Sequence, residues 1–266
     1  MANKKITIRD VAQEAGVSVA TVSYIINDRK DVKISDATRK KVLQVINLLN
    51  YSPNQTAKAL ASNKRGQIAY SITNNSSPIK LAERMYVMKK LSGFFHKKGF
   101  ELLFLPCDCL EKYDLVDAIL CFDMPKEDFK KLGDVNFAPL IALDTYIDDP
   151  LFFQINTKVS EVKKKADEHF NNQSYIYVST APEEEKVKEI LEKTFANIVF
   201  VETISDLNAV AGKSILVTSS VLKDCLPSEK NLFYVPSYTE EKCETIFECF
   251  KKASDRIPIE SHDIEI

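Results

Sequence analysis

The stretch SVATVSYIIN, residues 18–27, holds more apolar residues than one face of a soluble helix can bury. Ser18 has a hydroxyl that can cap a helix beginning at the next residue. Val22, Ile25 and Ile26 share one helical face and are predicted to pack against a neighbouring helix. The opposite face carries Val19, Ala20, Ser23, Tyr24 and Asn27. That second face needs a partner other than the core.

The residues around this stretch predict two further helices. Thr7 and Asp10 form a T-x-x-D start signal, and Gly16 permits the positive φ of a sharp helix end. After a loop, Ser35 caps another helix. The expected inward residues are Ile8, Val11, Ala12, Ala15 and Val17 before the stretch, and Val42, Val45, Ile46 and Leu49 after it. Three short helices with a three-residue turn between the first two form a helix-turn-helix unit.

The charge distribution suggests what the outer face contacts. The net charge is −2, yet residues 1–65 hold twelve Lys or Arg and five Asp or Glu, a balance of +7. The remainder of the chain balances at −9. A basic head on an acidic body suggests a polyanion-binding head, most often one that binds nucleic acid; the alternative that charge alone leaves open is a solvated basic surface.

On a DNA-reading helix, small or polar side chains allow close approach to the base edges. Val19 and Ala20 can touch thymine methyl groups, and Tyr24 can reach a base edge or a phosphate. Ser18, Thr21 and Asn27 are neutral donors suited to phosphates, which the helix N-terminus also attracts. The structural alternative is a helix partly buried in a larger bundle, with Val19 beneath a neighbour.

The segments ITIRDVAQEAGVSVATVSYIIN (6–27) and TRKKVLQVINLLNYSPNQTAKALAS (38–62) resemble the DNA-binding head of the lac repressor (LacI) family. The resemblance covers residues 6–63, and the loop at 28–34 is longer than usual in the family. It implies a hinge helix that orders on operator DNA and pairs with its dimer mate in the minor groove. Ser52 and Pro53 suit the start of that helix.

The resemblance also implies roles for single residues. Leu60 aligns with the leucine that wedges between central base pairs, and Ala57 with a small residue that lets two hinge helices approach. Tyr51 and Asn54 align with phosphate contacts. The predicted DNA-contacting set is Thr7, Ser18, Val19, Ala20, Thr21, Ser23, Tyr24, Asn27, Tyr51, Asn54, Ala57 and Leu60.

Beyond the head, apolar runs alternate with amphipathic helices. Strands are expected at 67–73, 100–106, 117–122, 139–144, 152–156, 174–180, 197–203, 214–219 and 231–237, and helices at 81–99, 125–132, 158–170, 183–195 and 239–253. This alternation predicts one or two doubly wound parallel sheets. It fits the two-lobed, periplasmic-binding-protein-like body of the same family, shortened in its second lobe. The predicted α/β fold therefore has a helix-turn-helix head (1–51), a hinge helix and linker (52–65) and a sensor and dimerisation body (66–266).

The resemblance predicts effector-binding residues only by their position in the chain. At most of these positions the residue differs from the one usual in the family. Ser77 replaces the first residue of an Asn-Pro-Phe, Asn156 begins a changed Asp-Asn pair, and Lys186 replaces a sugar-gripping arginine. Ser219 and Ser220 replace another Asn-Asp pair, whereas Asp144 is retained. The candidate effector set is Ser77, Asp144, Asn156, Lys186, Ser219 and Ser220. Either the ligand has fewer hydroxyls than a sugar, or no small molecule binds.

Other functions find little support in the sequence. It lacks a Walker loop, a G-x-G-x-x-G and a G-x-S-x-G elbow, and its histidines and cysteines match no zinc spacing. We therefore expect no enzyme activity, no cofactor and no metal. Without an apolar leader or membrane-length run, a cytoplasmic protein with no membrane partner is predicted.

The predicted function is a sequence-specific transcription regulator, most simply a repressor. It would act as a homodimer on near-palindromic double-stranded operator DNA, with a small-molecule effector of unknown identity. The alternatives are a ligand-binding protein whose head is vestigial, and a regulator that has lost its effector.

Overall fold

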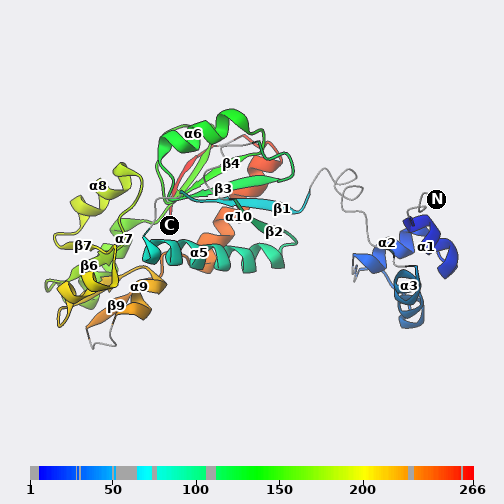
Figure 1. Cartoon of the computed structure of the whole chain (residues 1–266), viewed down its shortest axis with the longest axis horizontal. Coiled ribbons are helices and arrows are strands. Elements are labelled where there is room, and N and C mark those ends of the chain that lie inside the picture. The colour runs from blue at the N-terminus through cyan, green and yellow to red at the C-terminus, as the bar shows by residue number, and fades with distance from the viewer. Residues whose placement is uncertain are drawn as a thin grey trace. The chain divides into compact units, whose positions relative to one another are not determined.

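The computed structural model describes residues 6–27, 29, 31–49, 51, 65–73, 77–105, 112–226, 231–258 and 260–266. The chain divides into two compact units, Met1–Arg65 and Gly66–Ile266 (Figure 1). Each unit has its own hydrophobic core, so each is described by itself.

The first unit is a three-helix head made of α1 (Ile8–Ala15), α2 (Val19–Ile26) and α3 (Asp36–Leu48). Thr7, Ser18 and Ser35 cap the three helices, as the sequence predicts. Gly16 ends α1 with a φ of 65°, a left-handed conformation that costs glycine little. The buried core is Val11, Ala12, Ala15, Val22, Ile25, Val42 and Val45, with Ile8, Val17, Ile26, Ile46 and Leu49 packed around it. The predicted helix-turn-helix is confirmed.

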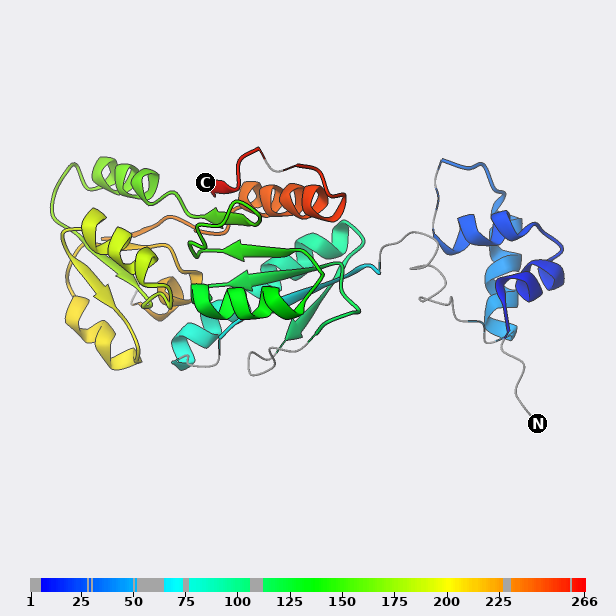
Figure 2. The ribbon, with the colours of Figure 1, turned by 90° about the horizontal axis from the view of Figure 1, so that it is seen from above.

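The second unit has two parallel sheets, one in each of two lobes (Figures 1 and 2). The first-lobe sheet has the order β10-β5-β4-β3-β1-β2. Its strands are β1 (Gln67–Ser71), β2 (Glu101–Leu105), β3 (Ala118–Phe122), β4 (Leu140–Leu143), β5 (Phe153–Asn156) and β10 (Asp263–Glu265). Residues of β3, β4 and β5 are buried throughout because helices cover both faces of the sheet.

Three helices cover the first-lobe sheet. α5 (Pro78–Lys97) and α10 (Glu240–Ser254) pack on one face, where Leu91, Phe95 and Phe250 are fully buried. α6 (Lys126–Val135) covers the other face through Phe129 and Leu132. Figure 1 shows α6 on the opposite side of the sheet from α5 and α10.

The second lobe has a four-stranded sheet of order β7-β6-β8-β9. Its strands are β6 (Ile176–Ser179), β7 (Ile198–Phe200), β8 (Ile215–Val217) and β9 (Leu232–Tyr234). α7 (Val159–His169) and α8 (Glu185–Thr194) pack on one face, and α9 (Ser220–Cys225) with the 3-10 helix η1 (Ile204–Val210) on the other. The predicted doubly wound body is therefore confirmed as two separate sheets.

The sequence-based elements need four corrections, of which one is that α6 ends at Val135 rather than at 132. α5 begins at Pro78 rather than at 81, because the Ser77 hydroxyl accepts a hydrogen bond from the Lys80 amide and Pro78 suits the first turn. The short elements α9 and η1 are additional to the predicted ones. The C-terminal strand β10 is also additional, and it pairs with β5 from Asp263 to Glu265.

Candidate functional sites: the outer face of the second helix and the cleft between the lobes

The outer face of α2 is the first candidate site. Val19 is 41% exposed and lies outside the core of the head, and Ala20 and Asn27 are also exposed. Ser23 and Tyr24 are half-buried. Within the described head no helix covers this face, so its small side chains remain open to a partner.

Several predicted DNA-contacting donors already have intrachain partners. Thr7 donates its hydroxyl to Asp10 at 2.6 Å, and the Ser18 oxygen accepts from the Thr21 amide at 3.0 Å. The Asn27 side-chain nitrogen donates to the Ser23 carbonyl at 2.8 Å. These bonds fix the ends of α1 and α2, so they hold the outer face in a set orientation.

Tyr24 is held from one side by the residues after α2. The Arg29 amide donates to the Tyr24 carbonyl at 3.0 Å, which brings the chain back across the helix end. The Arg29 guanidinium lies 5.7 Å from the Tyr24 ring centre and forms a fork with Asp31, at 2.6 and 2.5 Å. That fork lowers the pKa of Asp31 to about 2, so the carboxylate stays charged at neutral pH.

The remaining head predictions have less structural support. Tyr51 is half-buried against the head core, and its amide donates to the Ile46 carbonyl at 2.9 Å. Asn54, Ala57 and Leu60, together with the predicted hinge helix, lie outside the described residues. Their roles stay predictions.

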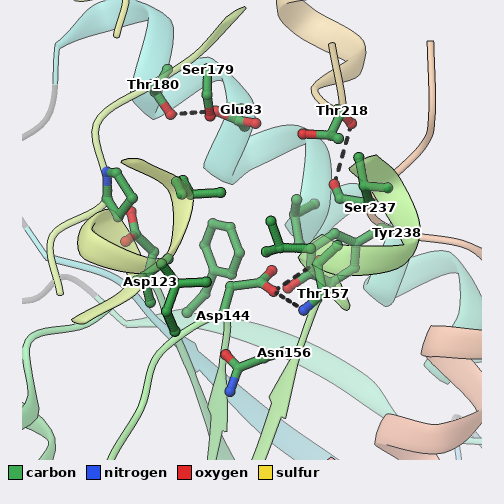
Figure 3. A pocket seen from close by; sticks show the side chains of 18 of the residues that line it. Glu83, Asp123, Asp144, Asn156, Thr157, Ser179, Thr180, Thr218, Ser237 and Tyr238 are labelled. Carbon is green, nitrogen blue, oxygen red and sulfur yellow. Dashed lines mark hydrogen bonds between the residues drawn. The ribbon is translucent and has the colours of Figure 1, made fainter. Parts of the chain in front are cut away.

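The second candidate site is the cleft between the lobes. The carboxyl ends of the strands in both sheets meet there, which is where ligands bind in open α/β folds. A cavity of about 120 Å³ lies in the cleft. First-lobe polar residues at its wall include Asp123, Asp144 and Asn156, and second-lobe residues include Thr180 and Thr218. Figure 3 shows these side chains around the cavity.

A buried ionic cluster crosses this cleft. Lys80 and Arg84 of α5 reach Asp123, which follows β3, at 3.1 and 3.0 Å. They also reach Glu183, in the second-lobe loop after β6, at 2.8 and 3.2 Å. The Glu183 amide donates to Asp123 at 2.8 Å. Two cations and two carboxylates therefore join the lobes.

Glu83, on the same helix, forms another link across the cleft. Its carboxyl accepts a hydrogen bond from the Thr180 hydroxyl at 2.7 Å (Figure 3). Burial raises the pKa of Glu83, although the hydrogen bonds of Thr180 and Ser219 oppose that shift.

Asp144 is paired with a third buried cation, Lys242. The Lys242 ammonium of α10 donates to Asp144 at 2.7 Å and to the Thr157 hydroxyl at 2.8 Å. It also lies 4.4 Å from the Tyr238 ring centre. Asn156, 3% exposed, lines the same cavity, and neither polar atom of its amide has a hydrogen-bond partner among the described residues.

The other candidate effector residues do not line this cavity. Ser77 and Ser219 cap α5 and α9, and Ser220 shares a 2.5 Å hydrogen bond with Tyr234. Lys186 pairs with Asp148 at 2.6 Å and lies over the Tyr146 ring. Of the six residues, the structure brings Asp144 and Asn156 to the cavity wall.

The cations that fill the cleft, Lys80, Arg84 and Lys242, are not among the residues predicted from the sequence. A signal was present in α5, where Lys80 and Arg84 continue the stripe of buried positions formed by Val87, Leu91 and Phe95. Charged residues within a buried helical stripe are rare unless they are paired. Glu183 lies 103 positions from Lys80 in the sequence, and Lys242 lies 98 positions from Asp144, so no local pattern indicates either pairing.

Two further observations concern other kinds of site. Among the described residues, no group of three or more His, Cys, Asp or Glu side chains could hold a metal ion. None of the helices in the described part is both long and apolar enough to cross a membrane.

The structure thus has a basic helix-turn-helix head and a two-lobed α/β body. Residues 7–54 match the family model "Bacterial regulatory proteins, lacI family". The matched residues include the three helices of the head.

Several curated proteins are similar to this chain in sequence. The chain is 55% identical over 69 residues to catabolite control protein A of Streptococcus mutans, covering 26% of this chain and 20% of that protein. It is 29% identical over 176 residues to the HTH-type transcriptional repressor PurR of Photobacterium profundum, covering 62% and 51%. It is 31% identical to the probable HTH-type transcriptional repressor ExuR of Bacillus subtilis, again covering 62% and 51%. The matches to these three relatives span about half of their length or less.

Solved structures show the same fold across the chain. The lac repressor dimer bound to operator and the anti-inducer ONPF has a TM-score of 0.59 and 16% identity, covering 99% of this chain and 96% of that one. The Cra transcriptional dual regulator of Pseudomonas putida, in complex with fructose 1-phosphate, has a TM-score of 0.51 and 14% identity, covering 76% and 96%. At 16% and 14% sequence identity, these two matches show a shared fold and nothing finer.

Proposed function

We propose that this protein is a sequence-specific DNA-binding transcription repressor that acts as a homodimer on a near-palindromic operator. The observation that carries the proposal is the uncovered outer face of α2, with Val19 and Ala20 exposed on a capped helix in a lacI-family head. One such helix reads a half-site, so two heads are needed for a full operator. The relatives named as repressors support the regulatory role.

The test is selection of bound sequences from random double-stranded DNA by the full chain. We expect enrichment of an inverted repeat, and sedimentation of the protein–DNA complex at two chains per site. A double variant, Val19→Glu with Ala20→Glu, is expected to abolish enrichment because it places negative charge against the bases. Enrichment of a single half-site would contradict the dimer, and no enrichment by the unaltered chain would contradict the function itself.

For the body, we propose that common sugars are not effectors. Asp144 is paired with Lys242, and the cavity of about 120 Å³ is smaller than a cavity of ~150 Å³ that just holds benzene. Sugar hydroxyls buried there without partners would each lose about 1–3 kcal/mol.

Isothermal titration with a panel of mono- and disaccharides tests this proposal. We expect no binding at low millimolar concentration and no change in operator affinity. A sugar that binds at micromolar concentration and shifts operator affinity tenfold would refute it.

A further inference from the structure

Two buried cations of the first lobe hold a carboxylate that belongs to the second lobe. Lys80 and Arg84 are 7% and 0% exposed and lie one helical turn apart on α5. Both contact the same oxygen of Glu183, Lys80 through Nζ at 2.8 Å and Arg84 through Nη2 at 3.2 Å. The first lobe thus presents a formed site for one carboxylate oxygen, and a side chain from across the cleft fills it.

The charges of the first lobe define what this site accepts. Asp123 contacts the same two cations and neutralises one of them. The carboxyl of Glu83 bonds instead to the Thr180 hydroxyl, at 2.7 Å. One positive charge remains for Glu183 to balance. A single negative charge satisfies the site, whereas a dianion would be repelled by Asp123.

We propose that Lys80 and Arg84 form a binding subsite for the carboxylate of a small effector, and that Glu183 occupies this subsite in the absence of the effector. The cavity beside the two cations has room for a few non-hydrogen atoms, and apolar side chains such as Val87 and Phe122 form part of its wall. The effector and Glu183 compete for the same cations. Binding of the effector therefore frees the Glu183 side chain and removes two of the ion pairs that join the lobes, those with Lys80 and Arg84. The regulatory consequence rests on the proposed function, whereas the subsite itself does not.

The experiment removes the internal carboxylate and supplies a free one. Glu183→Ala in the full chain leaves two buried cations with too little negative charge, so its melting temperature is expected to fall. Sodium acetate, the smallest carboxylate probe with a methyl group, should restore several degrees of that loss. Acetamide has the same shape without the charge and should restore nothing, as should sodium chloride at equal ionic strength.

Matched variants separate this effect from general salt effects. Glu185→Ala removes a nearby carboxylate whose side chain is 72% exposed, and acetate should not alter its melting temperature more than chloride does. Adding Lys80→Met to Glu183→Ala should abolish the response to acetate. Glu183→Ser also leaves room for the probe and serves as the test variant should the alanine variant not fold.

The outcomes distinguish this proposal from the proposed function. Restoration by acetate and not by acetamide supports the subsite, whatever the operator titration shows. Equal responses to acetate and chloride, while the unaltered chain still binds operator, overturn the subsite and leave the DNA-binding function intact.

Discussion

At the scale of single residues, Tyr24 is the side chain expected to read a base. It lies on the outer face of α2, and Arg29 packs against its ring. Tyr24→Ala should change the preferred base at particular operator positions and cost about 1–3 kcal/mol where a base contact is lost. Selection of bound sequences, followed by competition titrations, measures both effects.

Two further variants serve as controls for this prediction. Tyr24→Phe keeps the ring and removes the hydroxyl, so it separates hydrogen bonding from packing. Asn27→Ala should weaken binding to all sequences similarly, because Asn27 is expected to hold phosphate. An unchanged sequence preference in the Tyr24→Ala variant would remove Tyr24 from the base-reading set.

The raised pKa of Glu83 predicts how the stability of the fold depends on pH. Burial raises its pKa in the folded protein, so the folded state keeps this proton at pH values where the unfolded chain has lost it. The contribution of Glu83 to the free energy of unfolding therefore falls as pH rises from the unfolded pKa through the folded one.

Glu83→Gln should remove that contribution and raise the melting temperature at neutral pH, since the amide oxygen can still accept from Thr180. Melting curves between pH 4 and 8 test the prediction. A variant less stable than the unaltered chain at every pH would show that Glu83 is held there as a stabilising anion.

At the scale of elements, the turn between α1 and α2 depends on Gly16. An alanine Cβ would meet only Lys41 Nζ at 3.7 Å, an ordinary contact, so the cost of Gly16→Ala arises from the backbone φ of 65°. We expect a loss of about 1–2 kcal/mol in head stability. Hydrogen exchange of the buried amides in α1 and α3 measures this loss.

Gly93→Ala is the matched control for that variant. Gly93 lies within α5 and has no positive φ, and an alanine Cβ there would meet no other described atom within 4 Å. Alanine at this position should stabilise the body by about 0.5–1 kcal/mol. Equal effects of the two substitutions would contradict the role of the left-handed turn.

How far the sequence predicts each element depends on how local its signal is. The head helices are set by Thr7, Ser18 and Ser35 and by apolar spacing within a few residues, so the sequence predicts their limits closely. Strand β10 has three residues, two of them acidic, and forms only because β5 supplies its hydrogen-bond partners. No local pattern could indicate it.

The contacts in the cleft were even harder to predict from local sequence than strand β10. Asp144 and Asn156 could be predicted as effector residues because the family resemblance transfers ligand residues by position along the chain. The Lys242–Asp144 pair joins residues 98 positions apart, and the Lys80–Glu183 pair joins residues 103 positions apart. Such pairings follow from tertiary packing, which a single sequence does not encode in any short stretch.

At the scale of the whole molecule, the charge asymmetry predicts a strong salt dependence. Residues 1–65 hold twelve cations, and two heads engage one operator in the proposed dimer. Operator affinity should therefore fall with a log–log salt slope of roughly −5 to −10. Fluorescence anisotropy titrations over a range of salt concentrations measure the slope. A slope near zero would contradict electrostatic engagement of DNA.

The order of the lobes along the chain has a consequence for folding. The second lobe, from α7 to β9, is contiguous, whereas the first lobe is completed only when α10 and β10 return to it. Loop-closure entropy opposes such distant pairings, so they form slowly. During refolding, amides of β6 and β8 should become protected from hydrogen exchange before those that join β5 to β10. On a ribosome, the β5 edge of the first-lobe sheet would stay unpaired until β10 has emerged, and an unpaired strand edge is a site for wrong pairing with other chains.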